Sequence, residues 1–186
     1  MLTRPIPRTG EALPVVGIGT WRGFDIGGKA DQRATRRELL ASLFEADGTV
    51  IDTSPMYGRA ESVVGDLLPE TPGHDRGFVA TKVWTRGRRR GARQMNESMR
   101  RLGVDTIDLM QIHNLVDWRT QLETLRAWRD EGRIRYLGVA HYTTSAFDDL
   151  ENLMRREAVD FVQLPYSIGL TGADERLLIR EPFVAR

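Results

Sequence analysis

Short apolar runs alternate with amphipathic stretches along most of this chain. Six runs are short and almost wholly apolar, as is typical of strands buried on both faces of a parallel sheet. The stretches between them repeat apolar residues at helical spacing and carry polar residues on the other side. The alternation predicts βαβ units, which form a parallel sheet with helices packed outside it. The predicted strands cover residues 15–21, 49–52, 77–82, 107–113, 136–140 and 161–164, and the predicted helices cover residues 34–46, 61–68, 92–102, 118–131 and 144–157.

The two ends of the chain depart from this pattern. Residues 2–6 and the turn Thr9-Gly10-Glu11 predict a small N-terminal hairpin, a suitable plug for the bottom of a barrel. After the sixth strand, residues 174–180 predict one more helical segment, and no seventh or eighth strand follows. With 186 residues the chain is large enough for one hydrophobic core and small for two. We therefore expect a single domain over residues 1–186.

Composition and charge exclude several classes of protein. The chain is 40% hydrophobic and 28% charged, with a formal net charge of +1. This is typical of a soluble globular protein and gives no global signature of nucleic-acid binding. The basic run at residues 86–93 is suited to contact with phosphates, but we interpret it as a solvated loop with arginine-rich helix caps. No interleaved aromatic residues or recognition helix accompany these arginines, so we do not expect a nucleic-acid partner.

The same composition bears on the cellular compartment. The chain has no cysteine, which excludes disulfides, thiol catalysis and thiolate metal sites and fits a reducing compartment. Residues 1–13 contain no apolar run of signal-peptide length, and no later stretch approaches the roughly 18 apolar residues of a membrane helix. We therefore expect a soluble, cytoplasmic protein without a membrane partner.

Polar side chains stand at the carboxyl ends of successive predicted strands. In parallel α/β folds the chemistry gathers at these ends, because loops and helix N-termini converge there. A purely structural chain would not need an acid, a phenol, an amine and an imidazole at such positions. The residues are Asp52 and Tyr57 after the second strand, Lys82 at the third, His113 at the fourth, His141 after the fifth and Gln163 in the sixth.

Six stretches of the chain resemble the aldo-keto reductases in order and in spacing. They are GIGTW at residues 17–21, IDTSPMYG at 51–58, ATK at 80–82, DTIDLMQIH at 105–113, IRYLGV at 134–139 and VQLPY at 162–166. Together they span nearly the whole chain and are highly specific, although GIGTW alone is a weak signal. The resemblance implies a TIM-type (β/α) barrel that is incomplete, with about six parallel strands, because strands seven and eight are lacking.

The resemblance also implies reversible hydride transfer between a nicotinamide cofactor and an aldehyde or ketone, with NADPH as the usual cofactor and NADH as the alternative. Hydride addition builds negative charge on the carbonyl oxygen, so a proton donor is needed within hydrogen-bond reach, and we assign that role to Tyr57. We expect the ammonium of Lys82 to lower the pKa of this phenol. Asp52 would supply the counter-charge that a buried Lys82 requires. His113 would orient the carbonyl and share its developing charge.

The substrate pocket is assigned through the resemblance. Trp21 and Trp84 match the part of the family fold where aromatic side chains line the pocket, although packing against loops is an equally good interpretation. A metal site is not expected, because Asp52 and His113 belong to no short ligand-spacing motif.

The cofactor site is assigned in the same way. Gly19 and Thr20 would let the backbone approach the nicotinamide closely, and Gln163 matches the family glutamine that binds the carboxamide. Asp52 and His141 complete the predicted set. Many family members have Ser-Asn where this chain has an alanine followed by His141, so we expect altered anchoring of the carboxamide.

Two hypotheses about function remain open. The first is an NAD(P)H-dependent reductase of small carbonyl compounds, impaired because the family's phosphate-binding loops follow strands seven and eight. The second is a non-catalytic truncated remnant or scaffold with weak or no cofactor binding. A six-stranded arc also leaves two unpaired edges. Three outcomes are open: the segment 168–186 covers them, a homo-oligomer buries them, or the chain is only marginally stable. Of these we favour a homodimer or larger assembly. The sequence does not identify the substrate.

Overall fold

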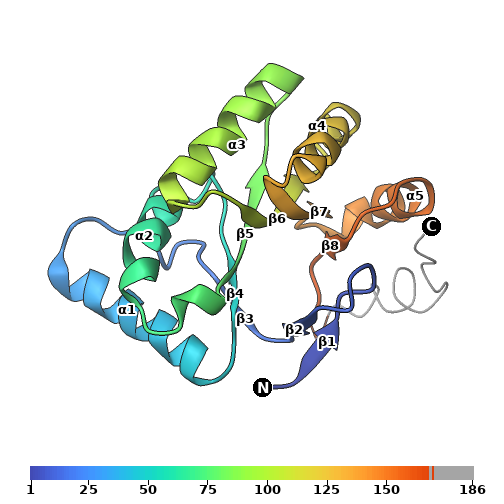
Figure 1. Ribbon diagram of the computed structural model, residues 1–186. Coiled ribbons are helices and arrows are strands. Elements are labelled where there is room, and N and C mark those ends of the chain that lie inside the picture. The colour runs from blue at the N-terminus through green and yellow to red at the C-terminus, as the bar shows by residue number, and fades with distance from the viewer. Residues whose placement is uncertain (168, 170–186) are drawn as a thin grey trace.

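The computed structural model describes residues 1–167 and 169, which form a curled parallel sheet with helices on its outer face (Figure 1). The sheet order follows chain order, and every neighbouring pair of strands is parallel. The predicted incomplete barrel is confirmed, because the parallel sheet of the described residues has six strands and a closed barrel of this type has eight. The six are labelled β3 to β8, because β1 and β2 belong to the N-terminal hairpin. The predicted segment 174–180 lies outside the described residues. The strands are β3 (Gly17–Gly19), β4 (Val50–Asp52), β5 (Phe78–Val83), β6 (Ile107–His113), β7 (Ile134–Ala140) and β8 (Phe161–Gln163).

The helices follow the strands as predicted, with shifted ends. The α-helices are α1 (Ala30–Glu45), α2 (Ala60–Leu67), α3 (Arg88–Leu102), α4 (Trp118–Asp130) and α5 (Phe147–Arg156). Short 3₁₀ helices are η1 (Leu68–Glu70), η2 (His74–Arg76) and η3 (Thr144–Ala146). Within the described part of the chain, no helix is long and apolar enough to cross a membrane.

The basic run departs most from the predicted elements. We expected a solvated loop, but α3 begins at Arg88, so most of the run forms the first two turns of a helix. Arginine is a good helix former, and the small, buried Gly91 lets these turns pack against Gln121 of α4. The first strand of the sheet is shorter than predicted, because Val15 and Val16 lie outside it and are exposed.

The predicted N-terminal hairpin is confirmed. Strands β1 (Thr3–Pro5) and β2 (Ala12–Pro14) pair in antiparallel fashion, and Ile6 between them is buried against aromatic side chains of the sheet. The hydroxyls of Thr9 and Tyr136 lie 2.7 Å apart, within hydrogen-bond distance. The hairpin therefore covers the amino-terminal ends of the strands (Figure 1).

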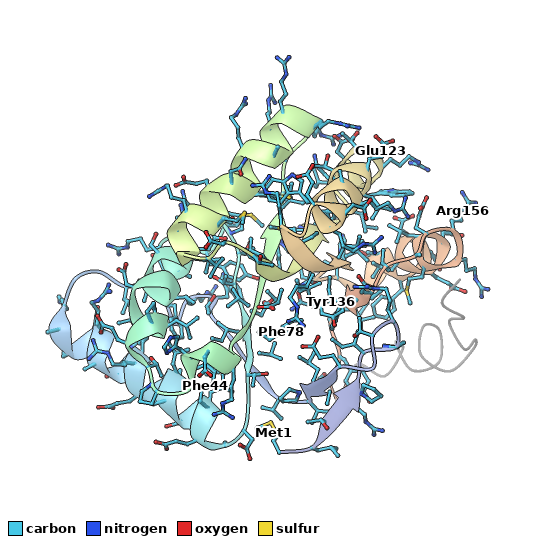
Figure 2. All side chains as sticks on the ribbon, viewed as in Figure 1. Met1, Phe44, Phe78, Glu123, Tyr136 and Arg156 are labelled. Carbon is cyan, nitrogen blue, oxygen red and sulfur yellow. The ribbon has the colours of Figure 1, made fainter. Side chains whose placement is uncertain are left out.

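The concave face of the sheet changes from apolar to polar along the strands. Successive residues of a strand point to opposite faces, so Phe78, Ala80 and Lys82 of β5 share the concave face. Near the hairpin this face is filled by the rings of Phe78, Tyr136 and Phe161, whose centroids lie 5.6 to 6.0 Å apart; Figure 2 labels the first two. Toward the carboxyl ends of the strands, polar side chains replace the rings, and they are Asp52, Lys82, Gln111 and His113.

Candidate active site

A buried ion pair joins the carboxyl ends of β4 and β5. The Lys82 side chain is 1% exposed, and its Nζ donates to Asp52 Oδ1 at 2.7 Å, to Asp52 Oδ2 at 2.8 Å and to the Thr53 carbonyl at 2.9 Å. Burial lowers the pKa of Lys82, while the carboxylates of Asp52 and Glu61 oppose that change. The structure thus brings Lys82 together with the counter-charge that its burial requires.

Tyr57 lies beside this ion pair on the loop between β4 and α2. Its ring is half-buried, and its centroid lies 5.3 Å from Lys82 Nζ. Burial raises the pKa of Tyr57, and the negative charge of Asp52 raises it further. The expected lowering of this pKa by Lys82 is therefore wrong for the structure, because the ammonium is compensated by a carboxylate within 2.8 Å. The phenol is protonated at neutral pH.

His113 closes the group at the end of β6. Its ring meets the edge of Trp84, with the two centroids 6.3 Å apart. Burial, and then the electrostatic effects of Lys82 and His141, lower the pKa of His113 to about 4, so the imidazole is neutral at neutral pH. Nδ1 of His113 is buried without a hydrogen-bond partner among the described residues.

The loop that follows His113 holds an unusual backbone conformation. Asn114, Leu115 and Asp117 have φ angles of 53°, 53° and 49°, in the left-handed region that non-glycine residues seldom adopt. Hydrogen bonds fix both ends of the loop, from Asn114 N to the Ala140 carbonyl at 2.7 Å and from Gly87 N to Asp117 Oδ2 at 2.7 Å. Strain held in this way is common beside functional sites.

The predicted cofactor residues gather around Asp52. Gly19 is in register with Asp52, and the N–H of Thr20 donates to the Asp52 carbonyl at 2.9 Å. Gln163 Nε2 lies 3.5 Å from Asp52 Oδ2. His141 donates its backbone N–H to the Gln163 carbonyl at 3.0 Å, and its Nδ1 lies 3.2 Å from the N–H of the nearby Thr143, which donates to it. The ring proton of His141 is then on Nε2.

The two tryptophans assigned to the pocket differ in their surroundings. Trp84 is 46% exposed and lies against His113. Trp21 is 62% exposed, and the guanidinium of Arg22 lies 4.5 Å from its ring centroid. The structure therefore brings Trp84, rather than Trp21, into contact with the group formed by Asp52, Tyr57, Lys82 and His113, which we call the quartet.

Sequence reasoning missed Gln111 of β6. Its side chain is 2% exposed, its Nε2 lies 3.5 Å from Asp52 Oδ1, and its Oε1 has no partner among the described residues. The signal was available, because an amide two positions before His113 in a mostly apolar strand must share the concave face with that histidine. A buried amide there supports the carboxylate of Asp52.

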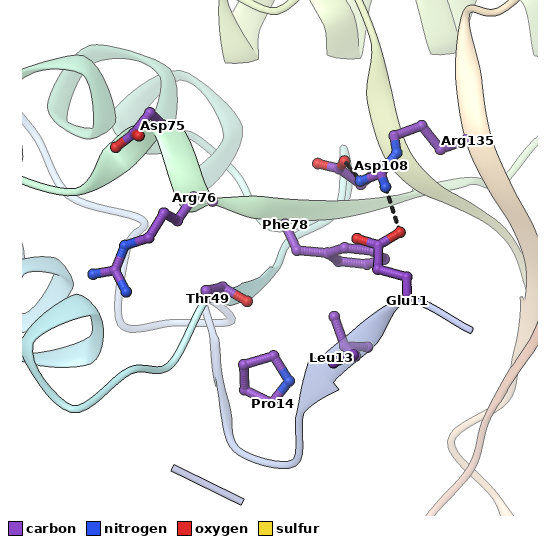
Figure 3. Close-up of a pocket in the computed structure, with 11 residues that line it drawn as sticks. Glu11, Leu13, Pro14, Thr49, Asp75, Arg76, Phe78, Asp108 and Arg135 are labelled. Carbon is purple, nitrogen blue, oxygen red and sulfur yellow. Dashed lines mark hydrogen bonds and ion pairs between the residues drawn. The ribbon is translucent and has the colours of Figure 1, made fainter. Parts of the chain in front are cut away.

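A cavity of about 370 Å³ lies at the opposite end of the sheet (Figure 3). It is lined by strand starts and the hairpin, including Phe78, Leu13 and Arg135. Three of its charged groups are already paired, since Arg135 bonds to Asp108 and Glu11. In barrels of this kind the amino-terminal face serves stability, so the quartet, and not this cavity, is the candidate site.

The chain matches the model of a known family. Residues 15–180 match the model described as the aldo/keto reductase family. Among curated relatives, aldo-keto reductase YhdN of Bacillus subtilis is 30% identical over 93% of this chain and 56% of its own length. Methylglyoxal reductase YeaE of Escherichia coli is 33% identical over 90% of this chain and 59% of its own length. The chain thus spans somewhat more than half the length of these relatives.

Solved structures give the same similarity at the level of the fold. The thermostable aldo-keto reductase Tm1743, solved with the inhibitor epalrestat, superposes with a TM-score of 0.78 at 26% identity, over 96% of this chain and 67% of that one. An aldo/keto reductase from Klebsiella pneumoniae, in complex with NADP and acetate, superposes with a TM-score of 0.74 at 29% identity, over 91% of this chain and 60% of that one.

Proposed function

Because this chain belongs to the aldo/keto reductase family, we propose that it reduces aldehyde or ketone groups with a reduced nicotinamide cofactor, and that Tyr57 donates the proton. One observation carries the proposal. The phenol of Tyr57, the buried pair of Lys82 and Asp52, and the neutral imidazole of His113 meet at the carboxyl ends of three adjacent parallel strands.

The protonation states of the quartet suit this chemistry. Tyr57 is protonated at neutral pH, so its hydroxyl can donate a proton to a carbonyl oxygen as negative charge develops there. His113 is neutral and can orient that oxygen through one hydrogen bond without competing as an acid. The charge of Lys82 is compensated by Asp52, so burial and this carboxylate keep Tyr57 protonated until the carbonyl oxygen takes its proton.

The residues beside the quartet fit the nicotinamide end of the cofactor, whose reduced form supplies the hydride when bound. A side chain added at Gly19 would meet open space, and the buried hydroxyl of Thr20 has no partner among the described residues. Gly19, Thr20 and Asp52 would line one side of the ring. Gln163 and His141 would hold the carboxamide, with His141 donating from Nε2. NADPH is the proposed cofactor, with NADH as the alternative.

The test of this proposal is a single change to the phenol. Tyr57→Phe keeps the ring and removes the proton donor, so the rate of NADPH oxidation with an activated aldehyde should fall at least about a hundredfold. Tyr142→Phe is the matched control, because Tyr142 is 70% exposed and has no role in the proposed mechanism. Equal rates for the wild type and Tyr57→Phe would refute the assignment.

A second candidate function is a non-catalytic scaffold that retains the quartet by descent. It is favoured by the extent of the match, because the chain spans only 56% and 59% of the length of the two relatives above. Fluorescence titration with NADPH separates the two functions. Tight and saturable binding supports the reductase, whereas the absence of binding supports the scaffold.

The remaining features of the proposal concern the whole chain. We propose that residues 1–186 act as one domain on a small carbonyl substrate in the cytoplasm. We also propose a homo-oligomer, because β3 and β8 each pair on one side only within the described residues, and Val15 and Val16 next to β3 are exposed. An unpaired strand edge favours association with another chain.

A further inference from the structure

A cluster of arginines follows the strand that carries Lys82 and takes no part in the chemistry described above. The run from Arg86 to Arg93 contains five arginines, all exposed. Arg88 is paired with Glu123 of α4, with Nη2 and Oε2 2.6 Å apart. The other four make no hydrogen bond or ion pair with a described residue, although the charge of Arg86 acts on the carboxylate of Asp117, and they are Arg86, Arg89, Arg90 and Arg93.

The position of the cluster is fixed by the strand that carries Lys82. After β5 ends at Val83, the chain passes Trp84 and enters α3 four residues later. Figure 1 shows the chain running from β5 to the upper end of α3. Because Trp84 contacts His113, the arginines begin two residues from a side chain that touches the quartet.

Hydrogen bonds hold the intervening loop. The N–H of Trp84 donates to Gln94 Oε1 at 2.7 Å, the Gln121 amide donates to the Thr85 carbonyl at 3.1 Å, and the N–H of Gly87 donates to Asp117 Oδ2 at 2.7 Å. Asp117 lies on the strained loop after His113. The loops after β5 and β6 are therefore joined, and a loop held in this way recognises a ligand at a low entropic cost.

The charges in this cluster do not serve the stability of the helix. The amino-terminal end of a helix carries a partial positive charge and is stabilised by acidic side chains. The first turn of α3 contains no acid and has arginines instead. The whole chain has a net charge of only +1, so this is a local excess of positive charge where the chain leaves the carboxyl end of β5.

From these observations we infer that Arg86, Arg89 and Arg90 favour carbonyl substrates that carry an anionic group, such as a carboxylate or a phosphate. The inference rests on the proposed function and narrows its substrate class. The neighbouring carboxylates of Asp117 and Glu123 reduce the net positive charge of the cluster. The cluster therefore suits one small anion and not a long polyanion. The carbonyl group would lie toward Tyr57 and His113, with Trp84 between them and the arginines.

The test compares two aldehydes that differ only in charge. Para-carboxybenzaldehyde is anionic at neutral pH, and its methyl ester is neutral. In Arg89→Gln/Arg90→Gln, the KM for the anionic aldehyde should rise about three- to tenfold at low salt, since each nearby charge changes binding about two- to threefold. The KM for the ester should not change. High salt should remove the wild-type preference, because it screens exposed charges.

A matched variant controls for the loss of two charges. Arg4 on β1 and Arg156 on α5 are exposed and lie away from α3 (Figure 2 labels Arg156). Arg4→Gln/Arg156→Gln should keep the wild-type preference for the anionic aldehyde. A preference that survives Arg89→Gln/Arg90→Gln, or falls equally in both variants, would overturn the inference.

Equilibrium binding separates this inference from the proposed function. Calorimetric titration with para-carboxybenzyl alcohol and with its methyl ester needs no turnover. The arginine site is supported if the wild type binds the carboxylate more tightly than the ester and Arg89→Gln/Arg90→Gln loses this difference. That result would stand even if the wild type reduced neither aldehyde, and only the proposed activity would then fail. Equal binding of the two alcohols by the wild type contradicts the arginine site.

Discussion

At the scale of single residues, the ion pair of Lys82 and Asp52 organises the candidate site. The identity of the quartet could be predicted from the sequence, because its members follow successive strands. The electrostatics of these residues could not be predicted from the sequence. The sign of the change in the Tyr57 pKa depends on how deeply the phenol is buried and on how far Asp52 compensates the charge of Lys82. Those are properties of the folded chain alone.

The ion pair predicts strong coupling between two substitutions. Asp52→Asn leaves the buried ammonium of Lys82 without its counter-charge and should lower the free energy of unfolding by about 3–5 kcal/mol. Adding Lys82→Met to that variant should recover part of the loss, with a coupling energy of about 1–3 kcal/mol. Urea denaturation of the four proteins of this cycle measures it. Additive effects would show that the two groups do not depend on each other.

The low pKa of His113 predicts a pH dependence of stability. The folded-state pKa of about 4 lies below the ordinary value of 6.5, so between these values the unfolded chain binds the extra proton. Stability is therefore complete above about pH 6.5 and decreases as the pH falls toward about 4. His113→Gln lacks this pH dependence. Between about pH 6.5 and 4, the difference in unfolding free energy between wild type and variant should therefore change by about 1–2 kcal/mol, after allowance for partial solvent exposure.

Urea denaturation at several pH values checks this prediction. An NMR titration of the His113 ring gives the pKa itself, and a midpoint near the ordinary value would contradict the structure.

At the scale of elements, hydrophobic periodicity predicted the strands and helices, and packing decided where they end. The third helix was predicted to start at residue 92 and starts at Arg88, because Gly91 lets the preceding turn approach Gln121. The last predicted helix divides into η3 and α5. Periodicity describes which face is apolar, but it does not show how closely a neighbouring helix approaches.

The contact between α2 and α3 predicts an unusual response to alanine. Gly65 lies inside α2, where Ala would raise helix propensity by about 1 kcal/mol. A Cβ at this position would lie 2.1 Å from the Arg101 carbonyl oxygen, which belongs to backbone and cannot rotate away. Gly65→Ala should therefore lower the free energy of unfolding by about 1–3 kcal/mol.

The control for this variant is Ser62→Ala in the same helix, which should leave stability within about 0.5 kcal/mol of the wild type. Thermal or urea unfolding measures both. A stabilised Gly65→Ala would mean that the two helices are further apart than the structure places them.

At the scale of the whole molecule, the described residues form an arc and not a closed barrel. The amino-terminal end is covered by the hairpin, while β3 and β8 each have one free edge within that part of the chain. The sequence predicted this arrangement because strand signals can be counted along the chain. It did not predict that Val15 and Val16 would be exposed beside the edge, since their apolar pattern reads as a continuation of β3.

The free edge predicts the effect of a charge on self-association. Val16 is 54% exposed next to β3, so Val16→Lys should weaken the proposed homo-oligomer by placing a charge at the edge. Sedimentation velocity over a range of concentrations measures the monomer fraction, which should rise in the variant. Leu39→Lys on α1, 46% exposed, is the control and should not raise it. A wild type that is monomeric at every concentration would contradict the oligomer.

The docking of the hairpin has a consequence for the order of folding. Thr9 contacts Tyr136, and Arg8 bonds to Asp160, at sequence separations of 127 and 152 residues. The hairpin therefore reaches its native partners only after β7 and the residues before β8 have been synthesised. Contacts of such separation form late and slowly, so the hairpin cannot nucleate folding, and Ile6 stays accessible to chaperones until most of the arc has formed.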